Sequence, residues 1–441
     1  MSQHSQFSLL KQKRFAPYFF TQFLGAFNDN VYKNALIILI AFQATTLLGK
    51  VDNSNSLINL SAGLFILPFF LFSATAGQLA DKYEKARLIR RIKLLEIGIM
   101  ALAVAGFYFK DVYFLMGILF LMGTQSSLFG PLKYSILPQH LKNEELVGGN
   151  GLVEMGTFLA ILLGTVAGGI LIGIPDTGHL IVGGVVISIA IVGYLFSLGI
   201  PTTPPAAPYL RINWNPFTET WRNIHFLYQN RLIFLVVIAI SWFWFFGALY
   251  LTQFPNYTRL NLQGNEHVAT SLLTLLSLGI GIGSLFCEKL SGHKVEMGLV
   301  PFGAVGITLF SLDLSLIHIE TLSGNGLRDP LAFLWMQNGW RIMLDVFCIG
   351  VFGGFYIVPL YAVLQQRTEP NHVSRVIASN NIISALFMVL SSIIAAVFLS
   401  NFTIPQLFLT VSIANGIMTG IIFIIVPEFI ICFWRWLFRR N

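Results

Sequence analysis

Long apolar windows recur along the chain and predict twelve membrane-spanning helices. Each window approaches the roughly 20 residues that a helix needs to cross the hydrocarbon core of a bilayer. Short segments rich in charged residues, proline and glycine separate the windows. The expected spans are 15–43, 56–80, 93–109, 112–133, 148–173, 179–199, 232–256, 268–290, 298–317, 343–365, 376–399 and 405–428.

The first apolar window contains charged residues. Gln22, Asp29 and Lys33 are spaced by seven and four residues, so they share one face of the helix. A carboxylate in the middle of a span costs about 2.5–3.5 kcal/mol on insertion scales. This polar face must therefore point into a protein interior or a wet cavity, where it is a candidate functional site. The alternative is a buried Asp29–Lys33 ion pair that only holds helices together.

The distribution of lysine and arginine supports the twelve spans and orients them. If both termini are cytoplasmic, 21 of the 27 cations fall in cytoplasmic connections or at the adjoining helix ends, among them Lys93, Arg375, Arg439 and Arg440. Five fall on the opposite side: Lys50, Lys110, Arg259, Arg328 and Arg341. Lys33 lies within a span. This asymmetry is the one that cytoplasmic loops of membrane proteins show.

Composition agrees with a polytopic, all-α membrane protein. The 441 residues are 55% hydrophobic and 11% charged, with a mean hydropathy of +0.72, which excludes a soluble globular domain. The net charge of +7 lies in the connections and does not indicate nucleic-acid binding. The three cysteines lack metal-ligand spacing, so neither a metal nor another cofactor is expected. The first window is expected to be a retained helix rather than a cleaved signal peptide.

The chain is expected to form two six-helix halves, residues 1–200 and 232–441, joined by a proline-rich cytoplasmic linker, 201–231. A faint repeat supports this division, because Gly130-Pro131-Leu132 and Asn150 have counterparts at Val358-Pro359-Leu360 and Asn380. Within the linker, 216–228 is a candidate interfacial helix. The aromatic and basic tail, 429–441, is another.

The connection from Gly77 to Arg87 resembles the signature between helices 2 and 3 of the major facilitator superfamily. Gly77 would permit close helix approach, and Asp81 would sit at the N-terminal end of a neighbouring helix and release it in another conformation. Lys82 and Arg87 supply the basic residues of this candidate gate. Glu84 stands where the signature has glycine. The alternative is a basic cytoplasmic loop without a gating role.

Several segments resemble the lysophospholipid transporter family of that superfamily. They are Phe23–Asn30, Gly130–Tyr134, Asn150–Glu154 with Gly164–Gly169, Val358–Leu360 with Gln365 and Gln366, and the segment at Asn380. The opening resembles transporter modules that are fused to an acyltransferase and an acyl-carrier-protein synthetase. The resemblance implies a non-enzymatic flippase of lysophosphatidylethanolamine and lysophosphatidylglycerol in a Gram-negative inner membrane. An acyltransferase or an acyl-carrier-protein synthetase of this kind would be a fused domain or a partner.

The polar residues within the spans suit such a head group. Asp29 and Glu154 could receive an ammonium, and Lys33 and Lys133 a phosphate. The remaining candidate ligands are neutral: Gln22, Asn28, Asn30, Gln125, Asn150, Tyr250, Asn380 and Asn381. Each also has a structural alternative. Lys133 could snorkel at a helix end, Glu154 could bond a neighbouring helix, and the asparagines of 380–381 could be packing contacts.

Span seven holds no cation between Leu232 and Thr258, so phosphate recognition in the second half would fall to hydroxyl and amide groups such as Tyr250 and Gln253. The aromatic run 242–246 is expected to face lipid or bulk side chains. Asp345 is expected to pair with Arg341, one turn earlier.

Two other functions fit these residues. One is a proton-coupled exporter of drugs or amphipathic solutes, in which Asp29 or Glu154 would titrate. The other is a membrane anchor for an acyltransferase that transports nothing.

Overall fold

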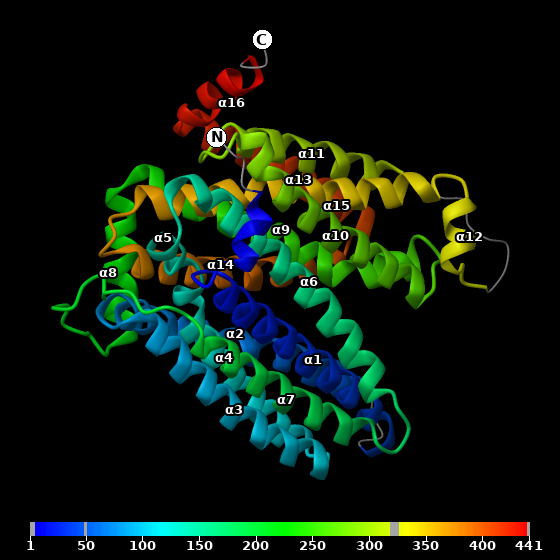
Figure 1. Ribbon diagram of the computed structural model, residues 1–441. Helices are drawn as coiled ribbons and strands as arrows, with labels where there is room; N and C mark the ends of the chain where they lie inside the picture. The colour runs from blue at the N-terminus through cyan, green and yellow to red at the C-terminus, as the bar shows by residue number, and fades with distance from the viewer. Residues whose placement is uncertain (1–4, 48–50, 318–325, 439–441) are drawn as a thin grey trace. The chain divides into compact units, whose positions relative to one another are not determined.

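The computed structural model describes residues 5–47, 51–317 and 326–438, and helices make up most of these ranges (Figure 1). Each of the twelve predicted spans overlaps a helix of at least 18 residues. These helices are α1 Ala16–Leu47, α2 Val51–Lys82, α3 Lys85–Phe109, α4 Val112–Ser135, α6 Leu146–Ile172, α7 Gly178–Leu198, α9 Arg231–Leu260, α10 Glu266–Ser291, α11 Leu299–Leu316, α13 Gly339–Arg367, α14 Val373–Leu399 and α15 Ile404–Ile425.

Short helices occupy the connections. They are η1 Gln6–Lys11, α5 Leu137–His140, η2 Asn143–Glu145, α8 Pro216–Gln229, α12 Pro330–Trp335 and α16 Glu428–Phe438. The helices predicted in the linker and the tail are therefore present as α8 and α16, and their position at a membrane surface stays a prediction. Three of the counted cations, Lys50, Arg439 and Arg440, lie outside the described residues.

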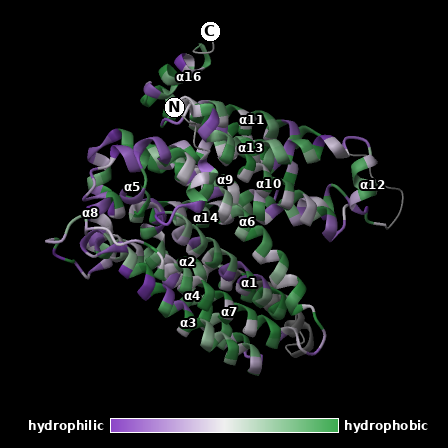
Figure 2. Cartoon of the chain, viewed as in Figure 1, coloured by the Kyte–Doolittle hydropathy of each residue, from purple (hydrophilic) through white to green (hydrophobic). Residues whose placement is uncertain are grey.

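In the described ranges, eleven helices are long and apolar enough to cross a membrane, and α1 is not among them. Five of the seven residues from Asn28 to Asn34 are polar, and they lower the hydropathy of α1. Figure 2 shows apolar residues along the long helices and more polar residues around α5 and α8. The chain is a multi-pass membrane protein whose first long helix is polar in the middle.

Helix α3 begins eight residues before the predicted start of its span. Glu84 caps it, because the carboxylate accepts hydrogen bonds from the backbone N–H groups of Ala86 and Arg87, both at 2.8 Å. Lys93 is consequently two turns inside the helix and only 1% exposed. The assignment of Lys93 to a cytoplasmic helix end was therefore wrong.

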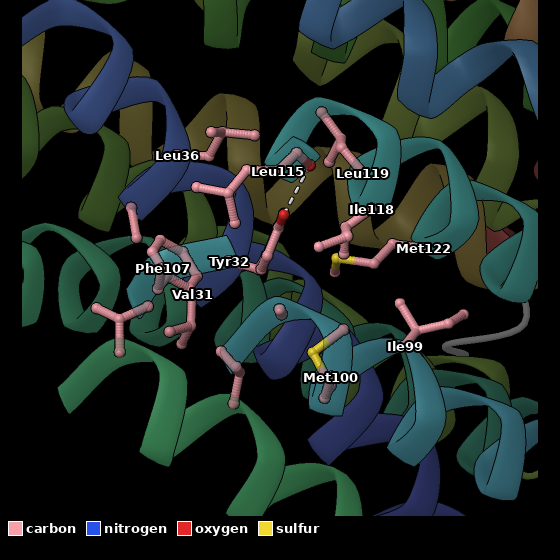
Figure 3. Close-up of a cluster of buried hydrophobic side chains, with 14 of the residues drawn as sticks. Val31, Tyr32, Leu36, Ile99, Met100, Phe107, Leu115, Ile118, Leu119 and Met122 are labelled. Atoms are coloured by element: carbon pink, nitrogen blue, oxygen red, sulfur yellow. Dashed lines mark hydrogen bonds between the residues drawn. The ribbon is translucent and has the colours of Figure 1, made fainter. Parts of the chain in front are cut away.

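The chain divides into two compact units. The first unit comprises residues 1–141, 159–229 and 368–382, and in it α2 packs on α4, and α7 on both α1 and α3. Its apolar core lies among α1, α3, α4 and α7 (Figure 3). There the hydroxyl of Tyr32 donates to the backbone oxygen of Leu115 at 2.7 Å, and its ring meets Phe107 edge to face. This bond satisfies the one polar atom that the tyrosine brings into the core.

The second unit comprises residues 142–158, 230–367 and 383–441. The division runs through α6 and α14, so the expected boundary at the linker stays a prediction. Within this unit α10 and α13 meet at glycines. A β-carbon on Gly350 would lie 2.9 Å from the backbone nitrogen of Ile280 and 3.0 Å from the α-carbon of Gly279. Small residues thus let the two helix backbones touch, as membrane helices often do.

We expect Gly350→Ala to destabilise the protein, because the added methyl group must push α10 and α13 apart. Overpacking of this kind costs about 1–3 kcal/mol. Gly420→Ala on α15 is the matched control, since a β-carbon there meets nothing within 4 Å. Thermal unfolding of the purified proteins should show a lower midpoint for Gly350→Ala alone. Equal midpoints for the two variants would contradict the close packing.

Candidate functional site

A buried carboxylate, Glu96, joins three helices of the first unit. Its Oε2 accepts from Lys93 Nζ at 2.6 Å and from Gln125 Nε2 at 3.0 Å. Its Oε1 accepts from Asn28 Nδ2 at 3.1 Å. Glu96 is 3% exposed, and a carboxylate at that depth is costly unless it is paired and hydrogen-bonded. Side chains from α1, α3 and α4 supply that compensation.

Asp29 continues this network and remains partly exposed. Its Oδ2 accepts from the hydroxyl of Ser126 at 2.7 Å, and that hydroxyl lies 3.3 Å from Gln125 Oε1. Lys33, one turn further along α1, is also partly exposed, and its Nζ lies 4.4 Å from the centroid of the Phe65 ring. No ion pair within 4.0 Å joins Asp29 to Lys33 among the described residues. A negative and a positive group are therefore held one turn apart by different partners.

The neutral candidates on α1 divide into two kinds. Gln22 and Asn28 are buried, and Asn28 serves the Glu96 network. Asn30 is partly exposed, but its Nδ2 donates to the backbone oxygen of Ala26 on its own helix at 2.7 Å. Of these three residues, Asn28 has a clear structural task.

Lys133 lies in the last turn of α4, seven residues beyond Ser126. Seven residues of helix correspond to about 10 Å along the axis. Its Nζ lies 5.0 Å from the centroid of the neighbouring Tyr134 ring, and its backbone oxygen accepts from the hydroxyl of Tyr18. Lys133 is therefore separated along α4 from Ser126, the residue of that helix that contacts Asp29.

Asn150 and Glu154 belong to the second unit, and both are fully buried on α6. Asn150 forms a reciprocal amide pair with Gln365 of α13: its Nδ2 donates at 2.6 Å, and Gln365 Nε2 donates back at 3.0 Å. The same Nδ2 also lies 2.8 Å from the backbone oxygen of Leu146. This geometry gives Asn150 a role in joining α6 to α13.

Tyr250 borders an apolar pocket of the second unit. Its ring stacks on Phe246 and on Phe408, with centroids 4.4 Å and 4.3 Å away. The pocket lies mainly between α9, α10 and α13, and its walls include Phe158, Phe243, Trp244, Leu276, Ile280 and Ile349. Phe158 and Trp244 stack in parallel at 6.1 Å. Part of the aromatic run on α9 therefore lines a cavity, whereas Trp242 bonds Asn415 through Nε1 at 2.8 Å.

Asn380 and Asn381 lie on the part of α14 that belongs to the first unit. Asn380 is completely buried, and neither atom of its amide has a hydrogen-bond partner among the described residues. A buried unsatisfied polar group costs about 1–3 kcal/mol. Asn381 rests on α4, where a β-carbon on Gly130 would lie 2.6 Å from its Nδ2. Asn380 is therefore the better candidate for a ligand contact.

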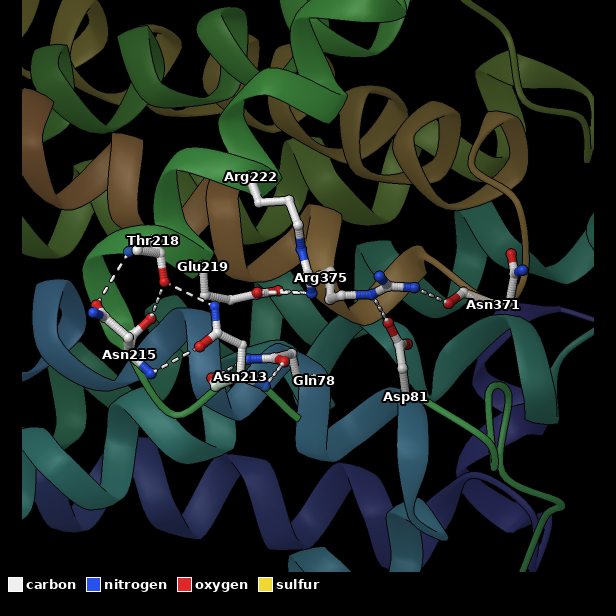
Figure 4. A network of polar contacts seen from close by, with 9 residues as sticks. All are labelled: Gln78, Asp81, Asn213, Asn215, Thr218, Glu219, Arg222, Asn371 and Arg375. Carbon is white, nitrogen blue, oxygen red and sulfur yellow. Dashed lines mark hydrogen bonds and ion pairs between the residues drawn. The ribbon is translucent and has the colours of Figure 1, made fainter. Parts of the chain in front are cut away.

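Two of the predicted gate residues, Gly77 and Asp81, meet the start of α14 within the first unit, and Figure 4 shows Asp81 beside Arg375. Asp81 is fully buried and accepts from the backbone N–H of Ser374 at 3.1 Å and from Arg375 Nε at 3.0 Å. A β-carbon on Gly77 would lie 2.7 Å from the β-carbon of Ala378. Asp81 thus occupies the kind of helix N-terminus that the sequence predicts, where negative charge is favoured.

The other gate candidates make fewer contacts. Lys82 lies 5.8 Å from the centroid of the adjacent Tyr83 ring, and the Arg87 side chain is exposed. A residue that sequence reasoning did not select, Gln78, forms two hydrogen bonds with the backbone of Asn213, at 2.8 Å and 3.0 Å. These bonds tie the linker to α2, as Figure 4 shows.

The expected pair between Asp345 and Arg341 was wrong. Arg341 binds the carboxylate of Asp313 on α11 instead, through Nε at 2.8 Å and through Nη2. Asp345 lies on α13 and is 2% exposed. A one-turn spacing allowed the expected pair, but Asp313 on another helix binds the guanidinium through two of its nitrogens.

Comparisons with known proteins agree with this architecture. The model of a family described as "Major Facilitator Superfamily" matches residues 18–324. Among solved structures, the human organic anion transporter MFSD10 superposes with a TM-score of 0.71 at 14% identity, covering 93% of this chain and 99% of that one. A bacterial homologue of the iron transporter ferroportin gives 0.66 at 12% identity, covering 92% and 98%. At such low identities these two structures establish the fold alone.

The sequences of curated relatives identify a family within this superfamily. The lysophospholipid transporter LplT of Enterobacter sp. (strain 638) is 30% identical over 352 residues, which is 78% of each chain. Proteins of the same name from Klebsiella pneumoniae (strain 342) and Escherichia coli O81 (strain ED1a) are 28% and 27% identical, again over 78% of each chain. The chain is therefore a membrane transporter rather than an enzyme, and it belongs to the lysophospholipid transporter family of the major facilitator superfamily.

Proposed function

We propose that this transporter moves lysophospholipids from the outer to the inner leaflet of the bacterial inner membrane, where they can be reacylated. The expected cargoes are lysophosphatidylethanolamine and lysophosphatidylglycerol. The name of the curated relatives supports the substrate class. The observation that carries the proposal is the pair of partly exposed, oppositely charged groups on α1, Asp29 and Lys33.

These two groups complement a phospholipid head group. Asp29 binds an ammonium, and Lys33 binds the phosphodiester through a charge-assisted hydrogen bond. The Glu96 network holds the helices around them, and Ser126 orients the Asp29 carboxylate at 2.7 Å. The unsatisfied amide of Asn380 adds a donor and an acceptor. In this proposal Lys133, Asn150 and Glu154 either position the helices or contact the head group later along the transport path.

The acyl chain requires only an apolar wall. Phenylalanine and leucine side chains supply such a wall, and the chain holds 40 phenylalanines. Aromatic and aliphatic side chains release an alkyl chain without breaking hydrogen bonds, which suits a carrier that must let its cargo go.

Transport follows alternating access in this proposal. Two six-helix halves rock about a central site, lysolipid enters sideways from the outer leaflet, and both termini are cytoplasmic. The contact of Asp81 with the start of α14 holds one state, with Gly77 permitting the close approach and Lys82 and Arg87 flanking it. Consumption of lysolipid by an inner-leaflet acyltransferase, as partner or fused domain, is sufficient to drive net movement.

We expect Asp29→Asn to lower the flux of labelled lysophosphatidylethanolamine into proteoliposomes by on the order of tenfold or more, the free-energy equivalent of losing one charged hydrogen bond. Asp176→Asn is the matched control, because it makes the same charge change at an exposed residue with positive φ, where asparagine is well tolerated.

Each variant is measured with and without an imposed pH gradient, at equal amounts of inserted protein. Flux that requires Asp29 and needs no gradient supports the proposal. Equal flux in Asp29→Asn and wild type would end the head-group assignment. Flux only under a gradient would favour a proton-coupled exporter, with Asp29 as the proton carrier.

We expect Asp81→Ala to speed hydrogen exchange at the start of α14, because the backbone N–H of Ser374 loses its acceptor. The loss of a hydrogen bond to a charged group corresponds to roughly tenfold or more in local opening. Asp111→Ala removes an equivalent cap from α4 and serves as the control. Exchange mass spectrometry of peptides covering 371–380 reports the change. Unchanged exchange there in Asp81→Ala would remove the basis for the gate.

A further inference from the structure

A polar cavity lies between α8 and the start of α14, inside the first unit. Its volume is about 170 Å³, and its walls are Arg222, Asn223, Phe226, His372, Arg375 and Val376. One water requires only ~10–15 Å³ of such space. The cavity is therefore large enough for a polyatomic ligand, and it shares no wall residue with the proposed transport site.

Two guanidinium groups from different helices line this cavity. Arg222 of α8 is about half exposed and contacts Glu219 at 2.7 Å, and Arg375 of α14 contacts Asp81 at 3.0 Å. Neither of these carboxylates is among the residues that line the cavity. Figure 4 shows both arginines beside their carboxylate partners. Because arginine carries five donors in a planar fork, each can hold its carboxylate and bind a further anion.

An unsatisfied donor lies in the same cavity wall. Asn223 is 5% exposed, and its Nδ2 has no hydrogen-bond partner among the described residues. A buried amide donor without an acceptor is costly, and the cavity is the space that its side chain lines. This amide is an independent sign that an acceptor belongs there.

The aromatic residues of the cavity wall hold α8 against the start of α14. The ring of His372 stacks on Phe226 at 4.6 Å with an interplanar angle of 9°. Burial, and then the nearby Arg375, lower the pKa of His372, which favours the neutral ring. The cavity thus presents two arginines, one amide and a neutral imidazole, which is a donor-rich set suited to the oxygens of a phosphate.

We propose that this cavity binds a phosphate group, which bridges Arg222 and Arg375 and accepts a hydrogen bond from the Asn223 amide. The bound phosphate links α8, the helix of the linker, to the first turn of α14, which Asp81 contacts. Occupancy of the cavity therefore strengthens the contact between Asp81 and α14. Two sources carry this chemistry: the phosphodiester of an anionic lipid and free inorganic phosphate. The exposed aromatic side chains of α8, Phe217, Trp221 and Tyr228, would bring the helix close to a lipid surface.

The test compares the wild-type chain with Arg222→Gln and Asn223→Leu. In the first arm, thermal stability in detergent is followed while inorganic phosphate replaces chloride at constant pH and ionic strength, which keeps screening equal. In the second arm, native mass spectrometry counts retained phosphatidylglycerol against phosphatidylcholine. Arg211→Gln is the matched control, because it removes an exposed linker arginine that does not line the cavity.

We expect wild type and Arg211→Gln to respond in one arm, either by a higher unfolding temperature in phosphate or by retaining more phosphatidylglycerol than phosphatidylcholine, and that arm identifies the source. Arg222→Gln and Asn223→Leu should weaken that binding by on the order of tenfold, as the loss of a hydrogen bond to a charged ligand predicts. Equal binding by Arg222→Gln and Arg211→Gln, or no ligand effect in either arm, would overturn the proposal. Because the readout is binding, the result is independent of lysolipid transport.

Discussion

The bonds that Glu96 accepts from Lys93, Asn28 and Gln125 are the constraint on which the first unit depends. A lone carboxylate or ammonium inside a membrane protein is too costly to keep, whereas a fully bonded pair is tolerated. Three donors from three helices surround one acceptor, so α1, α3 and α4 must keep their register. The register in turn places Ser126 against Asp29 at 2.7 Å.

The charged residues of the first unit have different roles because of this arrangement. Glu96 and Lys93 are buried and neutralise each other, and they leave Asp29 and Lys33 partly exposed, each with its own neutral or aromatic partner. If Asp29 and Lys33 were joined directly, a head group would have to break that pair before binding. Separate partners keep both charges available. The polar middle of α1, which lowers its hydropathy, is thus the feature that makes a site possible.

The sequence predicted the positions of the helices better than the contacts between them. Apolar windows located all twelve long helices, and the helical spacing of Asp29 and Lys33 placed them on one face. The signature at Asp81 predicted a contact with a helix N-terminus, but the residue that it bonds there, Ser374, lies 293 residues later, and one sequence carries no signal for such a pairing. Lys93 was misjudged because its span was started eight residues late, and Glu96 was overlooked with it. The cap by Glu84, which sets the true start, was visible only in the structure.

A double-mutant cycle on Lys93→Met and Glu96→Leu tests the central claim most directly. Unfolding midpoints and lysophosphatidylethanolamine flux are measured for both single variants and for the double variant. Breaking a buried pair from one side costs about 3–5 kcal/mol, because it leaves an uncompensated charge, whereas replacing both partners is far less harmful. The account predicts that the double variant is more stable than either single variant. Additive losses would contradict it, because they would mean that the two residues act independently.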